Sequence, residues 1–190
     1  MIKPIFLICM LCILFGGCQH EPTTPKPRAY PRIEYPSRNF IKFSDEECPF
    51  TFEYPDYAQI KKRDEACWFD LFMPAFDARL HCTYVPVTSR AKYDDLIKDS
   101  YDIADRINAR ANYMEETPIV NDQGVRGMAL TWTGPAASTL HFFLTDTTQH
   151  FFTAALYFDS KVNPDSLQPI AQFIRQDITH MISTFDWKKQ

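Results

Sequence analysis

Residues 138–158 read STLHFFLTDTTQHFFTAALYF, and this stretch determines the fold class. Its two apolar runs, 138–144 and 150–158, are rich in phenylalanine and threonine, and runs of this length and composition are typical of buried β-strands. The four residues between them, 146–149, are polar and suit a hairpin connection. We therefore expect the two segments to pair as antiparallel neighbours.

The segments upstream of this hairpin continue the pattern. Residues 113–120 and 125–132 are two further strand candidates, and the turn-forming sequence NDQG at 121–124 separates them. Gly134 and Pro135 mark another turn before the hairpin. Four strands joined by short turns predict an antiparallel meander.

The first half of the folded region holds more strand candidates. Residues 50–54 place aromatic side chains at alternating positions, residues 40–43 are another strand candidate with Phe40 and Phe43, and residues 67–74 are apolar for most of their length. Residues 79–87 alternate between two faces of a strand. One face carries Leu80, Cys82 and Tyr84, and the other carries His81, Thr83 and Val85.

Two segments have the 3.6-residue period of amphipathic helices. One begins at Thr88 or Ser89, either of which can cap it, and runs through Asn112, while the other spans residues 165–184. Helices and strands are segregated along the chain rather than alternating, which favours the α+β class. We expect a mostly antiparallel β-sheet covered by two helices.

The N-terminus carries the features of an export signal. Residues 5–15 form an unbroken apolar run, which suits a signal peptide but is shorter than the roughly 20 residues of a membrane-spanning helix. Two glycines then precede Cys18, as in a bacterial lipobox. We predict a lipoprotein signal peptide at 1–17 and a lipid-modified Cys18. An ordinary signal peptide cut elsewhere and an uncleaved anchor helix are the alternatives.

A proline-rich segment follows the predicted anchor. Residues 18–37 contain five prolines, which favour a stiff, extended spacer in front of a single domain at 38–190. The spacer also carries aromatic and cationic side chains, so it is either a solvated arm or an arm that docks on its own domain or on a partner. The partner-binding candidates are Tyr30, Arg32 and Tyr35.

The six cysteines have different fates if the signal is removed. Cys48 and Cys67 each begin a strand candidate, and an exported protein folds where disulfides form. A bridge between them would add roughly 3 kcal/mol of stability. Cys82 falls on an apolar strand face and is expected to be a buried thiol. A pairing that involves Cys82, or three free thiols, remains open.

The sequence contains no recognisable catalytic or cofactor motif. Five glycines in 190 residues do not form a phosphate-binding loop, and a net charge of −4 argues against a nucleic-acid partner. We find no metal-ligand spacing and predict no metal site, no cofactor and no enzymatic activity. Cys82 near His141 is the one pair that a weak hydrolase hypothesis can nominate.

Taken together, these segments resemble the gliding motility lipoprotein GldD family of Bacteroidetes. The resemblance extends over nearly the whole chain after the signal. It rests on Cys18, on PKPRAYPRI at 25–33, CPFTFEYP at 48–55, CWFD at 67–70 and LHCTY at 80–84, and on residues 151–187.

The resemblance implies a membrane-anchored accessory or assembly component of the gliding machinery, which is coupled to type IX secretion in these bacteria. It implies protein partners in that apparatus and a bilayer contact through acylated Cys18, but no catalytic centre. Gln19 after the anchor favours the outer membrane, and the lack of an acidic run after Cys18 favours its periplasmic face. The later strands and final helix also resemble PsbP/Mog1-type modules. An envelope binding module for a glycan, lipid or peptidoglycan ligand is the alternative function.

Overall fold

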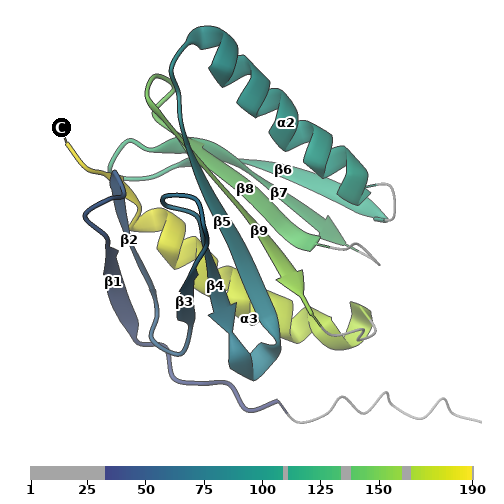
Figure 1. Ribbon diagram of the computed structural model, residues 1–190. Coiled ribbons are helices and arrows are strands. Elements are labelled where there is room, and N and C mark those ends of the chain that lie inside the picture. The colour runs from purple at the N-terminus through teal and green to yellow at the C-terminus, as the bar shows by residue number, and fades with distance from the viewer. Residues whose placement is uncertain (1–32, 109–110, 134–137, 160–163, 190) are drawn as a thin grey trace, which may run out of the picture. The chain divides into compact units, whose positions relative to one another are not determined.

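The computed structural model describes residues 33–108, 111–133, 138–159 and 164–189 (Figure 1). The predicted signal peptide, Cys18 and residues 18–32 of the spacer lie outside this range. The folded unit spans Glu34–Gln190.

The larger of two antiparallel sheets has seven strands in the order β3-β4-β5-β9-β8-β7-β6. Four consecutive strands, β6 to β9, form the meander that the turn residues predicted, and β9 then pairs with β5 from the first half of the chain. The strands are β3 (Gln59–Lys62), β4 (Phe69–Met73), β5 (Ala78–Pro86), β6 (Tyr113–Val120), β7 (Arg126–Thr133), β8 (Ser138–Thr145) and β9 (His150–Phe158).

The smaller sheet has the order β1-β2-β10 and comprises β1 (Phe40–Ser44), β2 (Phe50–Pro55) and β10 (Asp186–Trp187). The two strands predicted at 40–43 and 50–54 are confirmed, whereas β3 and β10 were not predicted. The predictions that strands begin at Cys48 and at Cys67 are wrong. Strand β2 begins at Phe50, and Cys67 has φ 59°, a left-handed conformation that a strand does not allow. A short 3₁₀ helix, η1 (Pro74–Phe76), links β4 to β5.

Both predicted helices are present, as α2 (Arg90–Asn108) and α3 (Pro164–Ser183). The Ser89 hydroxyl accepts a hydrogen bond from the Lys92 amide at 3.1 Å, so Ser89 caps α2. The prediction that this helix continues to Asn112 is wrong. The Asn112 amide instead donates to the Thr133 carbonyl at 2.9 Å, which extends the β6–β7 ladder.

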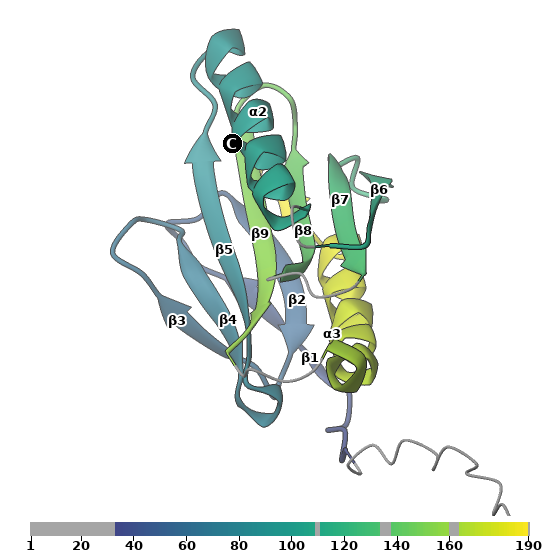
Figure 2. The same ribbon diagram turned by 90° about the vertical axis from the view of Figure 1, so that its right-hand side faces the viewer.

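The two helices cover opposite faces of the large sheet. Phe151 of β9 packs in a cluster with Leu96 of α2, whereas the next residue, Phe152, contacts Phe185 just after α3 with ring centres 5.1 Å apart. Successive strand residues point to opposite faces, so α2 lies on one side, and α3 with the small sheet lies on the other (Figures 1 and 2). The predicted α+β class is confirmed.

Candidate functional site

A row of three residues crosses the α2-covered face of the large sheet. His81 of β5 and His141 of β8 are both in register with Ala155 of β9, the strand between them. Adjacent strands lie about 4.8 Å apart, so two imidazoles flank one small side chain. The methyl group of Ala155 leaves open space where a larger residue would fill the gap.

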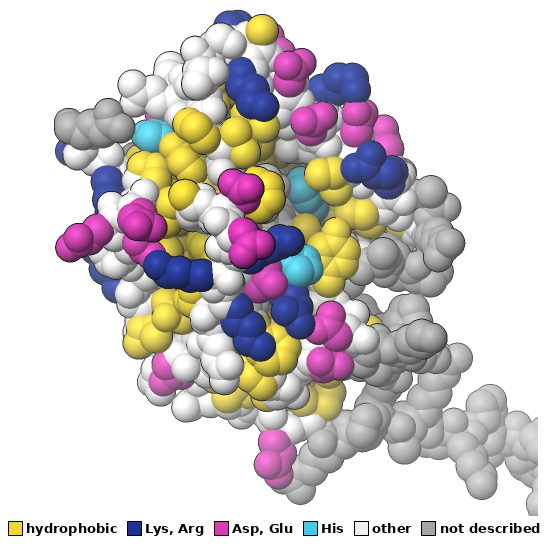
Figure 3. Space-filling model, in the orientation of Figure 1, with side chains coloured by type: hydrophobic (Ala, Val, Ile, Leu, Met, Phe, Trp, Pro, Cys, Tyr) yellow, Lys and Arg dark blue, Asp and Glu magenta, His cyan; other side chains and the backbone are white. Residues whose placement is uncertain are grey.

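A cavity of about 400 Å³ lies over this row. Figure 3 shows this face of the molecule, where histidine side chains lie among hydrophobic and charged ones. The volume is at the lower end of the range for small-molecule sites. The cavity is lined by His81, His141 and Ala155 together with Arg63, Thr83, Ile103, Thr153 and Tyr157.

His141 is an exception to the rule that buried polar groups find partners. Its side chain is buried, and in the part of the chain that the structure describes neither Nδ1 nor Nε2 has a hydrogen-bond partner. Burial lowers the pKa of His141 to about 4, so the ring is neutral at pH 7. A neutral imidazole has one N–H donor and one nitrogen acceptor, and both are unused here.

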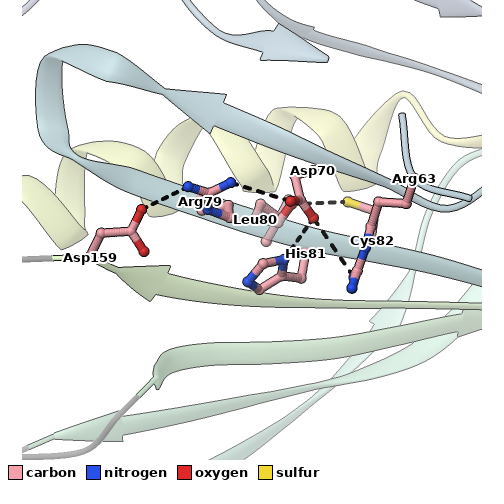
Figure 4. Close-up of polar contacts among 7 residues, drawn as sticks. All are labelled: Arg63, Asp70, Arg79, Leu80, His81, Cys82 and Asp159. Carbon is pink, nitrogen blue, oxygen red and sulfur yellow. Dashed lines mark hydrogen bonds and ion pairs between the residues drawn. The ribbon is translucent and has the colours of Figure 1, made fainter. Parts of the chain in front are cut away.

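His81, by contrast, is held in a charged network (Figure 4). Its Nδ1 lies 2.7 Å from Asp70 Oδ1, and because a carboxylate only accepts, Nδ1 is the donor. Arg79 contacts the same Asp70 at 3.4 Å and Asp159 at 2.9 Å. These contacts orient the His81 ring beside the cavity. The hydrogen bond to Asp70 uses Nδ1 and does not involve Nε2.

Arg63 completes the charged rim of the cavity. Its guanidinium lies 3.9 Å from Asp70, at the limit of an ion pair, and its side chain is 45% exposed. A second cation, Arg106, is close enough to Tyr157 to oppose the rise in the tyrosine's pKa that burial causes. Asp70 and Asp159 together match the charges of Arg63 and Arg79, and Arg106 near Tyr157 adds one further positive charge.

The pair nominated for a hydrolase, Cys82 and His141, is not assembled. Cys82 is in register with Ala154, and His141 is in register with Ala155, so the two side chains lie on opposite faces of the sheet. Cys82 is completely buried, as expected, and burial raises the pKa of its thiol well above the usual value. A thiol in this state is a poor nucleophile.

Cys48 and Cys67 lie together in the structure as a disulfide, with Cα atoms 5.4 Å apart. This separation is typical of disulfides. The pairing in the native protein stays a prediction.

The end of the spacer contacts the folded domain. Tyr35 packs on Phe173 of α3 with ring centres 4.6 Å apart, although 42% of Tyr35 remains exposed. Arg38 forms an ion pair with buried Asp177 at 2.7 Å and stacks on the same Phe173. Tyr57 also donates a hydrogen bond to Asp177. Tyr30 and Arg32, the other two partner-binding candidates, lie outside the described residues.

In the part of the chain that the structure describes, three or more histidine, cysteine or acidic side chains do not gather as a metal site would require. Within the same ranges, neither helix combines the length and apolar character needed to cross a bilayer.

Several members of this site were not recognised from the sequence. Asp70, Arg79 and Asp159 come from three separate segments, and their network depends on strand register. The alternation of His81 and Thr83 with apolar residues was visible, but a polar strand face is usually solvated surface. No local pattern distinguished this face from such a surface.

The chain matches a protein-family model and is similar in fold to solved structures. The family model described as gliding motility lipoprotein GldD matches residues 20–187. The solution structure of cyanobacterial PsbP (CyanoP) from Synechocystis sp. PCC 6803 is similar with a TM-score of 0.49 and 12% sequence identity, covering 80% of this chain and 94% of that one. This likeness concerns the fold alone. A search of curated proteins found no match.

Proposed function

We propose a function from one premise: the chain belongs to the gliding motility lipoprotein GldD family, whose model covers residues 20–187. The protein acts as a non-enzymatic accessory or assembly component of the gliding machinery and is linked to type IX secretion. The family match over most of the chain is the observation that carries this proposal.

The anchor in this proposal is acylated Cys18. Each buried methylene of an acyl chain such as palmitate contributes about 0.8 kcal/mol, so several chains hold a protein at a bilayer almost permanently. The signal peptide at 1–17 is removed, and residues 18–37 hold the domain at 38–190 off the membrane. Gln19 and the absence of an acidic run favour the periplasmic face of the outer membrane.

Contact with protein partners is assigned to the arm that carries Tyr30, Arg32 and Tyr35. One contact at its end and one at the first residue of the domain support this assignment. Tyr35 packs on Phe173, and Arg38 is paired with Asp177. An arm tied down at one end loses less conformational entropy when it binds a partner.

The anchoring proposal is tested by Cys18→Ala, with Cys12→Ala as the matched control. Both changes remove one N-terminal cysteine, but Cys12 belongs to the predicted signal and is cut away. We expect Cys18→Ala to move the protein from the membrane to the soluble fraction and to abolish gliding, and Cys12→Ala to change neither. Normal spreading by cells that carry the soluble form would contradict the proposal.

The cavity over Ala155, which we call the α2-face cavity, favours a second candidate function, an envelope binding module for a glycan, lipid or peptidoglycan ligand. It combines an aromatic ring from Tyr157 with convergent polar groups from His81, His141 and Thr83. This composition is typical of ligand pockets. Specific binding of an envelope fragment to the purified lipoprotein would support this function.

A further inference from the structure

His141 is one of the residues that line the α2-face cavity. It is 2% exposed, and among the described residues neither of its ring nitrogens has a hydrogen-bond partner. An unmade hydrogen bond on a buried group costs stability, so such a residue in a pocket calls for an explanation beyond folding. A ligand with a hydroxyl or amide group would supply the missing partner.

The remaining lining residues narrow the chemistry of that ligand. Thr83 and Thr153 are in register across β5 and β9 and add two hydroxyl groups to the cavity. Ile103 and Tyr157 add apolar surface, which suits the body of a small organic molecule. These groups alone would accept a neutral ligand.

Arginine at the rim of the cavity favours a ligand with a negative charge. Arg63 lines the cavity, and its 3.9 Å contact with Asp70 is long. Asp70 is already engaged by His81 at 2.7 Å and by Arg79 at 3.4 Å. Arginine binds carboxylates with strong, charge-assisted hydrogen bonds, so Arg63 can exchange its weak contact for a ligand carboxylate.

We infer that this cavity binds a small carboxylate that also carries hydroxyl or amide groups, with the carboxylate at Arg63 and an amide or hydroxyl at His141. A volume of about 400 Å³ suits a compound of monosaccharide or dipeptide size. Two sources share this chemistry, an acidic N-acyl sugar and the carboxyl end of a short peptide. The inference deepens the second candidate function and is independent of the role in gliding.

The test is equilibrium dialysis of the purified lipoprotein in detergent with three radiolabelled probes. N-acetylmuramic acid represents the acidic sugar, N-acetyl-dialanine represents the peptide, and N-acetylglucosamine is the neutral control. We expect at least one acidic probe to bind more tightly than the neutral sugar. The tighter of the two acidic probes identifies the source.

Four variants locate the site. Arg63→Gln is expected to weaken binding of the acidic probe about tenfold, the effect of losing one charge-assisted contact. Arg90→Gln removes the same charge from an exposed side chain on α2, away from the cavity lining, and is expected to leave binding unchanged. His141→Leu removes the unpaired nitrogens, and Ala155→Leu fills the space between the two histidines. Both are expected to lower binding while the protein keeps its circular dichroism spectrum.

Three results would overturn the inference, and each has a different consequence for the two candidate functions. Equal binding of N-acetylglucosamine, unchanged by Arg63→Gln, removes the requirement for a carboxylate but leaves a binding module for neutral ligands. Binding that survives both His141→Leu and Ala155→Leu places the ligand elsewhere on the protein. If none of the three probes binds, the ligand class is wrong, while the gliding result for Cys18→Ala still decides the first function separately.

Discussion

The neutral, unpartnered state of His141 predicts how stability changes with pH. Its pKa is lowered by burial from 6.5 to about 4 in the folded protein, whereas the ring titrates near 6.5 in the unfolded chain. Between these two values the unfolded chain binds a proton that the folded protein does not. The stability from neutral His141 is therefore fully present above pH 6.5 and is lost as the pH falls from 6.5 to 4.

The size of this loss follows from the shift. One pKa unit corresponds to 1.36 kcal/mol, so the shift to about 4 predicts a loss of roughly 3 kcal/mol between pH 7 and pH 4. His141→Leu removes this titration. It also replaces an unpaired polar group with an apolar one of similar size, which is expected to stabilise the protein by about 1 kcal/mol at pH 7.

The assay is urea unfolding of the wild type and of His141→Leu at pH 7, 5.5 and 4. Other titratable groups contribute to both proteins and largely cancel in the difference. We expect the stability advantage of the variant to grow by roughly 3 kcal/mol from pH 7 to pH 4. A difference that does not change with pH would refute the argument that His141 is buried in its neutral form.

Three further predictions concern the framework of the fold. Reduction of the Cys48–Cys67 disulfide should lower the free energy of unfolding by roughly 3 kcal/mol. Mass spectrometry after non-reducing digestion would exclude the bridge if it detected alkylation of Cys67 in protein that was never reduced. Phe152→Ala should cost about 3–5 kcal/mol in denaturant unfolding because Phe152 is completely buried, while Val120→Ala at a 72% exposed position should change stability by less than about 0.5 kcal/mol. Arg38→Ala should destabilise the folded protein by roughly 2 kcal/mol, because it leaves the buried carboxylate of Asp177 without its ion pair. The control Arg90→Ala breaks an exposed ion pair with Asp94 and should have little effect on stability. Equal effects of the two variants in thermal unfolding would contradict this prediction.

The parts of the fold that were predictable are those with strong local signals. The hairpin of β8 and β9 has two apolar runs around a polar connection, and α2 has both a serine cap and a helical period. β3 has neither signal, because its sequence QIKK is mostly exposed and becomes a strand only by pairing with β4. β10 is two residues long, too short for any period to be recognised.

The candidate site was less predictable because it depends on register. His81 and His141 are sixty positions apart and meet only through β9, and a shift of one residue in either pairing would turn one histidine to the other face. The β8–β9 ladder also contains an irregularity between Ser138 and Leu140 that no sequence pattern predicted. The same dependence explains why the nomination of Cys82 with His141 failed.

Purification from membranes tests whether this lipoprotein works within the gliding and secretion apparatus. Affinity-tagged protein with Cys18 intact is solubilised in detergent, and co-purifying proteins are quantified by mass spectrometry against an untagged strain. We expect enrichment of gliding or type IX secretion subunits with the intact protein and their loss with Cys18→Ala. Recovery of no such subunit above the untagged control would contradict it.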